Sequence, residues 1–367
     1  MPPVRILVVD DSAVHRKLLC AALSGDPAIE VAGLAADGRI ALSKMQQIRP
    51  DLITLDIEMP GWNGLETLAE IRKLDPKLPV IMFSSLTEHG AAATLEALAL
   101  GASDYAAKPA NAAYSDEAIA RIRADLIPKI KALCTHPAVA ATARHASRPF
   151  PATAGARALH APVEVLAVGA STGGPNALAA LLPILPADFP VPILIVQHMP
   201  PIFTRLLAER LAKTSKIRVR EGEAGQLLEP GTAWIAPGGD HMVVERQGPG
   251  VRIEINREAP ENSCRPSVDV LFRSVAQVYG AHALSVVMTG MGSDGVRGAQ
   301  QLCEAGGEVI AQDEASSVVW GMPGLVVTAG HASGVYPLDS LGPEILRRVM
   351  PRGPLFKPHA PALRLRS

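Results

Sequence analysis

The run Ile6-Leu-Val-Val-Asp-Asp11 decides how the first part of the chain is interpreted. Four consecutive apolar residues indicate a strand that is buried on both faces, which is typical of parallel sheets covered by helices. The run ends in two acidic residues, and apolar residues follow at helical spacing, at Val14, Leu18 and Ala22. The segment therefore predicts a strand that leads into a helix, with two carboxylates at the turn.

The same alternation of strand and helix continues along the first part of the chain. Further strands are expected at residues 29–32, 52–55, 80–83 and 105–107, with helical patterns between them. Five strands with intervening helices predict an α/β fold, a doubly wound parallel sheet with helices on both faces.

The length of 367 residues, at roughly 150 residues per domain, suggests two domains and linking chain. We expect a first domain at 1–125, a linker at 126–160, a second α/β domain at 161–350 and a loose tail at 351–367. The linker is indicated by the absence of acidic residues between 130 and 162, where the hydrophobic periodicity also fades. Strand patterns return at 165–168, 193–196, 233–235, 284–288 and 309–311.

Composition narrows the class of protein. Lysine plus arginine is 35 against 36 acidic residues, so the net charge of −1 offers no global field toward nucleic acid or anionic lipid. No basic helix-turn-helix pattern follows residue 130, which argues against a DNA-binding output domain. The four cysteines are scattered with no C-x-x-C pair, as expected in a reducing compartment. With no transmembrane-length apolar run and no signal peptide, we expect a cytoplasmic protein.

Three carboxylates are expected to converge in the first domain. Asp10, Asp11 and Asp56 each follow a predicted strand, and the carboxyl ends of parallel strands meet at the edge where ligands bind. Converging carboxylates repel one another unless a cation neutralises them, and such oxygen ligands suit Mg²⁺. Ser84 and Lys108 end the next two strands and could donate to a phosphoryl group. The pattern predicts an aspartyl-phosphate site with Asp56 as nucleophile; the alternative is a set of helix caps and solvated strand ends.

These residues resemble the receiver domain of response regulators over about residues 1–125. The matching motifs are Asp10-Asp11, Asp56-Ile-Glu-Met-Pro-Gly61, Ser84-Ser85 and Lys108-Pro109. The resemblance implies a flavodoxin-like domain in which Asp56 accepts the phosphoryl group and Asp10, Asp11 and Asp56 hold Mg²⁺. It also implies that Lys108 contacts the phosphoryl group and that Ser84 is the switch hydroxyl.

A candidate nucleophile opens the second domain. Gly169-Ala-Ser-Thr-Gly173 fits G-x-S-x-G directly after an apolar strand, which places Ser171 on a tight strand-to-helix turn. His198 and Asp294 follow later strands and are expected at the same sheet edge. A serine needs a base and an orienting acid, so the three predict a triad. Their order, Ser…His…Asp, differs from that of α/β-hydrolases.

Two other interpretations of this domain stay open at this point. The glycine-rich turn could bind a dinucleotide, although Ser171 replaces the middle glycine and Asp188 precedes a strand where an acid should end one. The domain could also be a binding module without catalysis. For an enzyme, the Met291 N–H and the helix start after Gly173 are plausible oxyanion donors. Gln312-Asp313 is read as a turn and receives no role.

The second half resembles the catalytic domain of the CheB chemotaxis receptor methylesterase family. The matching motifs are Gly169-Ala-Ser-Thr-Gly-Gly-Pro175, Gln197-His-Met-Pro200, Arg265-Pro-Ser-Val-Asp-Val-Leu-Phe272, Met288-Thr-Gly-Met-Gly-Ser-Asp-Gly295 and Ala311-Gln-Asp-Glu314. The resemblance implies that Ser171 is the nucleophile, His198 the general base and Asp294 its orienting acid. Met291, and with it Thr172, would stabilise the oxyanion.

The two resemblances together imply a function. It is the hydrolysis of glutamyl methyl esters on methyl-accepting chemoreceptors, with release of methanol, and in many relatives the deamidation of receptor glutamines. A CheA-type histidine kinase would supply the phosphoryl group; Mg²⁺ would serve the receiver, and the esterase would need no cofactor.

A linker of roughly thirty residues spans about 30 Å, so we hypothesise that the unphosphorylated receiver covers the Ser171 cleft.

Overall fold

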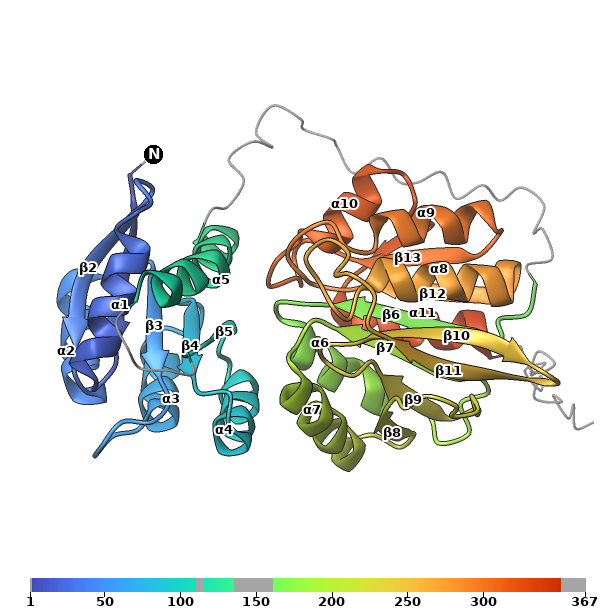
Figure 1. The fold of residues 1–367 in the computed structure, drawn as a ribbon, viewed down its shortest axis with the longest axis horizontal. Coiled ribbons are helices and arrows are strands. Elements are labelled where there is room, and N and C mark those ends of the chain that lie inside the picture. Colours follow the sequence, from blue (N-terminus) through green and yellow to red (C-terminus); the bar gives the residue numbers. More distant parts are fainter. Residues whose placement is uncertain (1, 110–114, 135–160, 351–367) are drawn as a thin grey trace, which may run out of the picture.

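The computed structural model describes residues 2–109, 115–134 and 161–350, which form two α/β domains (Figure 1). The linker expected at 126–160 lies outside the described residues from 135 onward, as does the whole tail expected at 351–367. Among the described residues, no helix combines the length and the apolar character that crossing a membrane requires.

The first domain is a five-stranded parallel sheet in the order β2-β1-β3-β4-β5. Its elements are β1 (Val4–Val9), α1 (Ala13–Leu23), β2 (Ile29–Ala35), α2 (Gly38–Ile48), β3 (Leu52–Asp56), α3 (Gly64–Leu74), β4 (Val80–Ser84), α4 (Glu88–Ala99), β5 (Asp104–Ala107) and α5 (Asp116–Cys134). Alternate residues of β1 point to opposite faces: Ile6 and Val8 pack against α1 and α5, and Leu7 and Val9 pack toward α2, α3 and α4. The predicted doubly wound sheet is confirmed.

The second domain is built on a seven-stranded parallel sheet in the order β14-β13-β12-β6-β7-β9-β8. Its elements are β6 (Val165–Ala170), α6 (Gly174–Leu181), η1 (Leu182–Ile184), β7 (Ile193–Gln197), α7 (Pro201–Thr214), β8 (Arg218–Glu221), β9 (Thr232–Ile235), β10 (His241–Gln247), β11 (Gly250–Asn256), α8 (Val268–Tyr279), η2 (Gly280–His282), β12 (Ala283–Val287), α9 (Val296–Glu304), β13 (Glu308–Gln312), α10 (Met322–Thr328), β14 (Gly334–Tyr336) and α11 (Leu338–Val349). Helices α6, α7 and α11 cover one face, and α8, α9 and α10 cover the other. The predicted α/β class is confirmed here too.

The sequence patterns do not predict four strands of the second domain. β8 and β14 are the two edge strands, and they are only 4 and 3 residues long. β10 and β11 form a separate antiparallel hairpin, paired from His241↔Asn256 to Gln247↔Gly250. β8 and the two hairpin strands carry charged residues, and β14 has only three residues, so all four lack the continuous apolar run that identified the central strands.

Helix α5 continues past residue 125 and ends at Cys134. Leu126 and Ile130 extend its buried stripe against α1. Their burial stabilises the helix beyond residue 125, where the amino-acid composition of the chain begins to change. The boundary expected at residue 125 therefore falls inside this helix.

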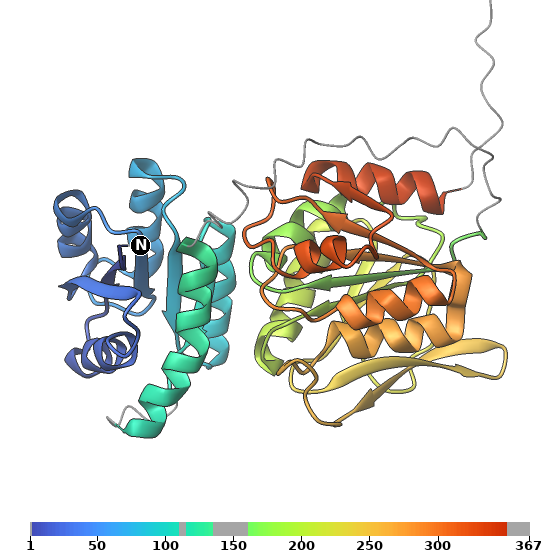
Figure 2. The ribbon, with the colours of Figure 1, turned by 90° about the horizontal axis from the view of Figure 1, so that it is seen from above.

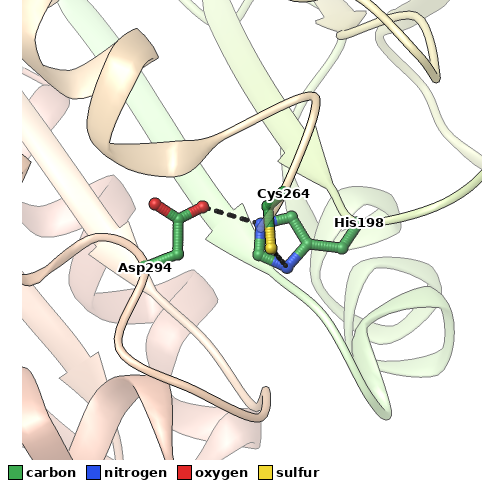
Figure 3. Close-up of side chains that lie close together, drawn as sticks. All are labelled: His198, Cys264 and Asp294. Atoms are coloured by element: carbon green, nitrogen blue, oxygen red, sulfur yellow. Dashed lines mark hydrogen bonds and ion pairs between the residues drawn. The ribbon is translucent and has the colours of Figure 1, made fainter. Parts of the chain in front are cut away.

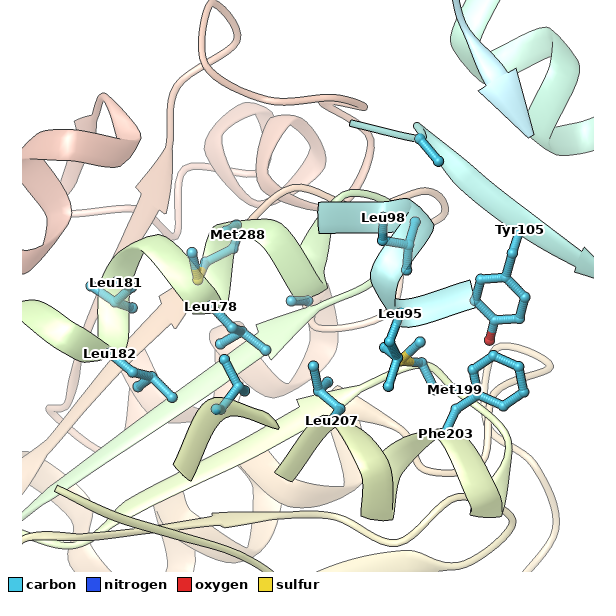
Figure 4. Close-up of a cluster of buried hydrophobic side chains, with 14 of the residues drawn as sticks. Leu95, Leu98, Tyr105, Leu178, Leu181, Leu182, Met199, Phe203, Leu207 and Met288 are labelled. Carbon is cyan, nitrogen blue, oxygen red and sulfur yellow. The ribbon is translucent and has the colours of Figure 1, made fainter. Parts of the chain in front are cut away.

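The α4–β5–α5 side of the first domain faces the second domain in both views (Figures 1 and 2). The rings of Tyr105 and Phe203 stack across the interface, with centroids 4.8 Å apart and an interplanar angle of 10°. Leu95 and Leu98 of α4 join the same buried cluster (Figure 4). Apolar packing between the domains therefore adjoins the edge of the sheet where Ser171 lies.

Polar contacts surround this apolar centre. Asn176 Nδ2 donates to Leu98 O at 2.6 Å, and Arg210 donates to the carbonyl oxygen of Leu95. Arg205 and Glu88 form an ion pair at 2.8 Å. Side chains of α6 and α7 thus donate hydrogen bonds to backbone carbonyl oxygens of α4, and a side chain of α7 also forms an ion pair with a side chain of α4.

Candidate functional site

The acidic residues of the first domain come together at the carboxyl edge of its sheet. One carboxylate oxygen each from Asp10, Asp11 and Asp56 lies within 4.8 Å of the others. The Lys108 Nζ is 2.5 Å from Asp56 Oδ1 and 3.7 Å from Asp10 Oδ2. The Ser84 hydroxyl is buried and faces the carbonyl oxygens of Ser85 and Gly90, at 3.2 and 3.1 Å. The lysine thus contacts the carboxylates, whereas the Ser84 hydroxyl is turned to the backbone.

Burial makes the carboxylates of Asp10 and Asp56 costly to ionise. Burial and the neighbouring Asp10 raise the pKa of Asp56 to about 6, against the opposing effect of Lys108. Burial also raises the pKa of Asp10, and Lys108 again opposes it. Among the described residues, neither buried Oδ2 atom accepts a hydrogen bond, although Asp10 Oδ2 lies within ion-pair distance of Lys108 Nζ at 3.7 Å and of His15 Nδ1 at 3.4 Å. Two buried carboxylate oxygens that accept no hydrogen bond, beside an exposed Asp11, fit a hard divalent cation such as Mg²⁺.

The second domain places Ser171 on a tight turn between β6 and α6. Gly173 caps the helix with φ +80°, and a Cβ there would meet Val318 at 2.7 Å, so only glycine fits. The Ser171 N–H donates to Thr289 O at 3.0 Å, which ties the turn to the loop after β12. On that loop, a Cβ at Gly290 would lie 2.8 Å from the Ser171 Cβ. The chain before Met291 therefore runs directly beside the serine.

His198 and Asp294 are joined by a hydrogen bond of 2.8 Å between Nε2 and Oδ2 (Figure 3). Burial raises the pKa of Asp294, but the bond to His198 and two backbone N–H donors outweigh it and lower the pKa to about 2. An ionised carboxylate can only accept, so Nε2 carries the proton of this bond and Nδ1 is the nitrogen left to take up or release a proton. Burial lowers the pKa of His198, but the bonds to Asp294 and Cys264 raise it to about 9.

Five donors hold the Asp294 carboxylate in place. Its Oδ1 accepts from Asn262 Nδ2, the Ser267 hydroxyl and the Asp269 N–H, and its Oδ2 accepts from the Val268 N–H and from His198. Three of these donors come from the start of α8, where the helix terminus itself favours a negative charge. The acid is therefore rigid and charged at neutral pH.

The second imidazole nitrogen faces a residue that the sequence did not single out. The Cys264 Sγ lies 3.6 Å from His198 Nδ1 (Figure 3). Ser171, in contrast, makes no hydrogen bond to His198 among the described residues, although both line one cavity of ≈ 760 Å³ between the domains. Cys264 directly precedes the motif that begins at Arg265, and that adjacency was the only signal for it.

The expected oxyanion residues also line this cavity, but one of them is engaged. Met291 lies on its wall, whereas the Thr172 hydroxyl donates to Asp104 Oδ2 of the first domain at 2.6 Å. The cavity extends to Lys108 of the acidic site. The lining includes Lys108 but none of the three aspartates, so the cavity reaches the margin of the acidic site. A side chain of the first domain binds the neighbour of Ser171.

Two buried glutamines support the turn and the loop. Gln197 Nε2 donates to Ser171 O at 2.9 Å, and Gln312 Oε1 accepts from the Thr289 N–H at 2.8 Å. Gln312 was interpreted only as a turn residue. Its side chain fixes the loop that leads to Met291, a contact between strands that no local pattern reveals.

The chain matches two family models, one for each domain. Residues 6–120 match the response regulator receiver domain, and residues 166–345 match the CheB methylesterase. A protein-glutamate methylesterase/protein-glutamine glutaminase from Trichodesmium erythraeum is 52% identical over 353 residues, covering 95% of this chain and 100% of that relative. One from a Nocardioides species is 51% identical over 365 residues, covering 98% and 99%.

A solved structure agrees with the second match. The crystal structure of the Thermotoga maritima CheB methylesterase catalytic domain is 39% identical, with a TM-score of 0.50, and covers 51% of this chain and 99% of that one. The two domains define a response regulator with an enzymatic output domain. The chain belongs to the CheB family of protein-glutamate methylesterases/protein-glutamine glutaminases.

Proposed function

We propose that this chain hydrolyses glutamyl methyl esters on methyl-accepting chemoreceptors, releases methanol, and deamidates receptor glutamines. The observation that carries the proposal is the hydrogen bond between His198 and Asp294, beside the cavity that Ser171 and His198 line. That bond leaves the imidazole in the tautomer that a serine nucleophile needs.

In the proposed reaction, Ser171 Oγ attacks the ester carbonyl while its proton passes to His198 Nδ1. The imidazolium that forms is stabilised by Asp294. The Met291 N–H, and the Thr172 hydroxyl once Asp104 releases it, are the proposed donors to the oxyanion. His198 then protonates the methoxide, methanol leaves, and water hydrolyses the acyl-enzyme to glutamate.

Deamidation follows the same course with ammonia as leaving group. An amide nitrogen must be protonated before it departs, so the proton held on His198 Nδ1 is more important in that reaction than in ester cleavage. The esterase step itself is proposed to need no cofactor, since the serine, the base and the oxyanion donors all come from the chain.

We propose that Asp56 accepts a phosphoryl group from a CheA-type histidine kinase. Asp10, Asp11 and Asp56 would hold the Mg²⁺ that this transfer uses, and the ion would neutralise their mutual repulsion. Lys108 contacts Asp56 and is suited to bind the phosphoryl oxygens, and Ser84 would turn inward toward them. We propose the cytoplasm as the location of the protein. The limits 161–350 remain our proposal for the catalytic domain.

We further propose that the unphosphorylated receiver domain restricts access to Ser171. Asp104, Tyr105 and Leu98 line the interdomain cavity on the receiver side. Deleting residues 1–130 should then raise the basal esterase activity. If the truncated protein is folded and no more active than the full chain, the receiver does not occlude the site.

The test of the function is methanol release from methylated chemoreceptor membranes, with and without acetyl phosphate and Mg²⁺. Release that rises with acetyl phosphate and falls by at least about 10³-fold in Ser171→Ala supports the esterase and its control. Asp56→Ala should keep the basal rate and lose the response to acetyl phosphate. Unchanged release in Ser171→Ala would contradict the proposed nucleophile.

A further inference from the structure

Cys264 and His198 form a pair of nitrogen and sulfur donors on the wall of the interdomain cavity (Figure 3). The proposed hydrolysis uses the imidazole to move a proton, and none of its steps needs a thiol. The sulfur nevertheless lies against the one imidazole nitrogen that Asp294 leaves open.

The separation of the two donors matches the span of a tetrahedral metal site. Zinc binds sulfur at about 2.3 Å and imidazole nitrogen at about 2.0 Å, which at a tetrahedral angle sets the two atoms about 3.5 Å apart. The Cys264 Sγ and His198 Nδ1 are 3.6 Å apart. An ion could therefore enter between them with little movement of either side chain.

The outer partner of such a site is also present. A metal-binding histidine usually donates its other ring N–H to a carboxylate, which orients the ring and strengthens the ligand. Asp294 accepts from His198 Nε2 at 2.8 Å and is itself held by four other donors. The acid, the imidazole and the thiol also lie together, with one ligand atom of each within 4.8 Å of the others.

The loop that carries the thiol is fixed. Asn262 and Ser263 both have positive φ, 52° and 63°, and Glu261 and Cys264 exchange two backbone hydrogen bonds. Asn262 Nδ2 also donates to the carboxylates of both Asp269 and Asp294. The position of Cys264 beside His198 Nδ1 is thus fixed by the loop.

We propose that Cys264 Sγ and His198 Nδ1 bind a soft divalent cation, Zn²⁺ in the first place, and that binding reversibly inhibits the enzyme. The thiol loses its proton to solvent, the thiolate and the neutral imidazole each donate an electron pair, and water fills the remaining positions. The inhibitory part rests on the proposed function, because the ion occupies the nitrogen that would accept the Ser171 proton. With two protein ligands, the ion is exchangeable, unlike the ion in four-ligand structural sites.

The test uses Co²⁺ as a spectroscopic substitute for Zn²⁺ on the full chain, with excess Mg²⁺ present to occupy the receiver site. We expect a thiolate-to-cobalt charge-transfer band that saturates at one ion per chain and disappears when Zn²⁺ is added. Cys264→Ala should lose the band, and Cys264→Ser, which keeps the size of the side chain, should lose it too. Cys303→Ala is the matched control, because Cys303 is also a half-buried free thiol and donates to the His331 carbonyl oxygen as Cys264 does to that of Asn262; it should keep the band.

Methanol release gives the second readout. Zn²⁺ should inhibit the unchanged chain and Cys303→Ala alike, and at least about tenfold more Zn²⁺ should be needed for Cys264→Ala. A cobalt band that persists in folded Cys264→Ala, or no band in the unchanged chain, would overturn the site. The band does not depend on turnover, so an absent esterase activity with an intact band would count against the proposed function and not against the metal site.

Discussion

The Thr172 hydroxyl donates a hydrogen bond of 2.6 Å to the Asp104 carboxylate, so a receiver side chain binds the residue next to Ser171. Both groups are buried. The bond engages a hydroxyl that is a candidate oxyanion donor, and Asp104 lies four residues before Lys108 on the same strand and turn. A shift of β5 on phosphorylation would therefore act directly on Thr172.

Asp104→Ala should raise basal esterase activity in the absence of acetyl phosphate. The variant removes a buried acceptor worth about 1–2 kcal/mol to the docked state, so the open fraction should increase by about tenfold. Glu88→Ala is the matched control, since it breaks the exposed ion pair with Arg205 at the same interface. Exposed pairs contribute at most about 1 kcal/mol, so its effect should be much smaller. Equal basal rates in Asp104→Ala and the unchanged chain would show that this bond does not restrain the enzyme.

The esterase should become faster as the pH rises toward 9. The base must be neutral, and the pKa of His198 is raised to about 9, so kcat/KM should increase about tenfold per pH unit below that value. The same shift in the pKa of His198 stabilises the fold below the unfolded pKa of about 6.5, and this contribution is lost as the pH rises through about 9.

Because Cys264 is among the groups that raise the pKa of His198, Cys264→Ala should move the acid limb of the kcat/KM profile to lower pH. Cys303→Ala should leave the profile in place, and an acid limb near pH 6.5 in the unchanged chain would contradict the assignment.

Mg²⁺ should stabilise the receiver domain against unfolding. Binding to the three carboxylates removes their repulsion, and at a hundred times Kd it adds about 2.7 kcal/mol to the free energy of unfolding. Without Mg²⁺, Asp56→Asn should unfold at a higher temperature than the unchanged chain, because it removes a charge buried beside Asp10. Calorimetry with and without the ion checks both points. An equal gain from Mg²⁺ in Asp56→Asn would place the ion elsewhere.

Gln312→Ala should lower kcat more than it changes KM. The variant leaves the buried Thr289 N–H without its acceptor, at a cost of about 1–3 kcal/mol, and loosens the loop that presents Met291. Methanol-release kinetics and thermal unfolding of the same preparation separate the two effects. Gln300→Ala, which breaks only an exposed contact to Glu304 on α9, should change neither.

The central strands and the residues at their ends were predictable from the sequence. Buried parallel strands are continuous apolar runs, and their carboxyl ends share an edge, so Asp10 and Asp56 in one domain and His198 and Asp294 in the other were expected to converge. The structure brings each of these pairs together. Their catalytic and metal-binding roles remain predictions.

Contacts between distant segments were not predictable in the same way. Cys264 and His198 are 66 residues apart, and their contact depends on a loop in which two residues adopt positive φ. The bond between Asp104 and Thr172 depends on how two separately folded sheets dock, and neither domain's pattern encodes the surface of the other. The edge strands β8 and β14 were missed because both are short, and β8 also carries charged residues.

The stacked rings of Tyr105 and Phe203, with Leu95 and Leu98 beside them, have a consequence for behaviour in the cold. Separating the two domains would bring these apolar side chains into water. Such exposure increases the heat capacity, and the tendency of apolar groups to stay together weakens on cooling. The balance between the docked and separated arrangements therefore depends on temperature, and cooling should act in the direction that we propose for phosphorylation.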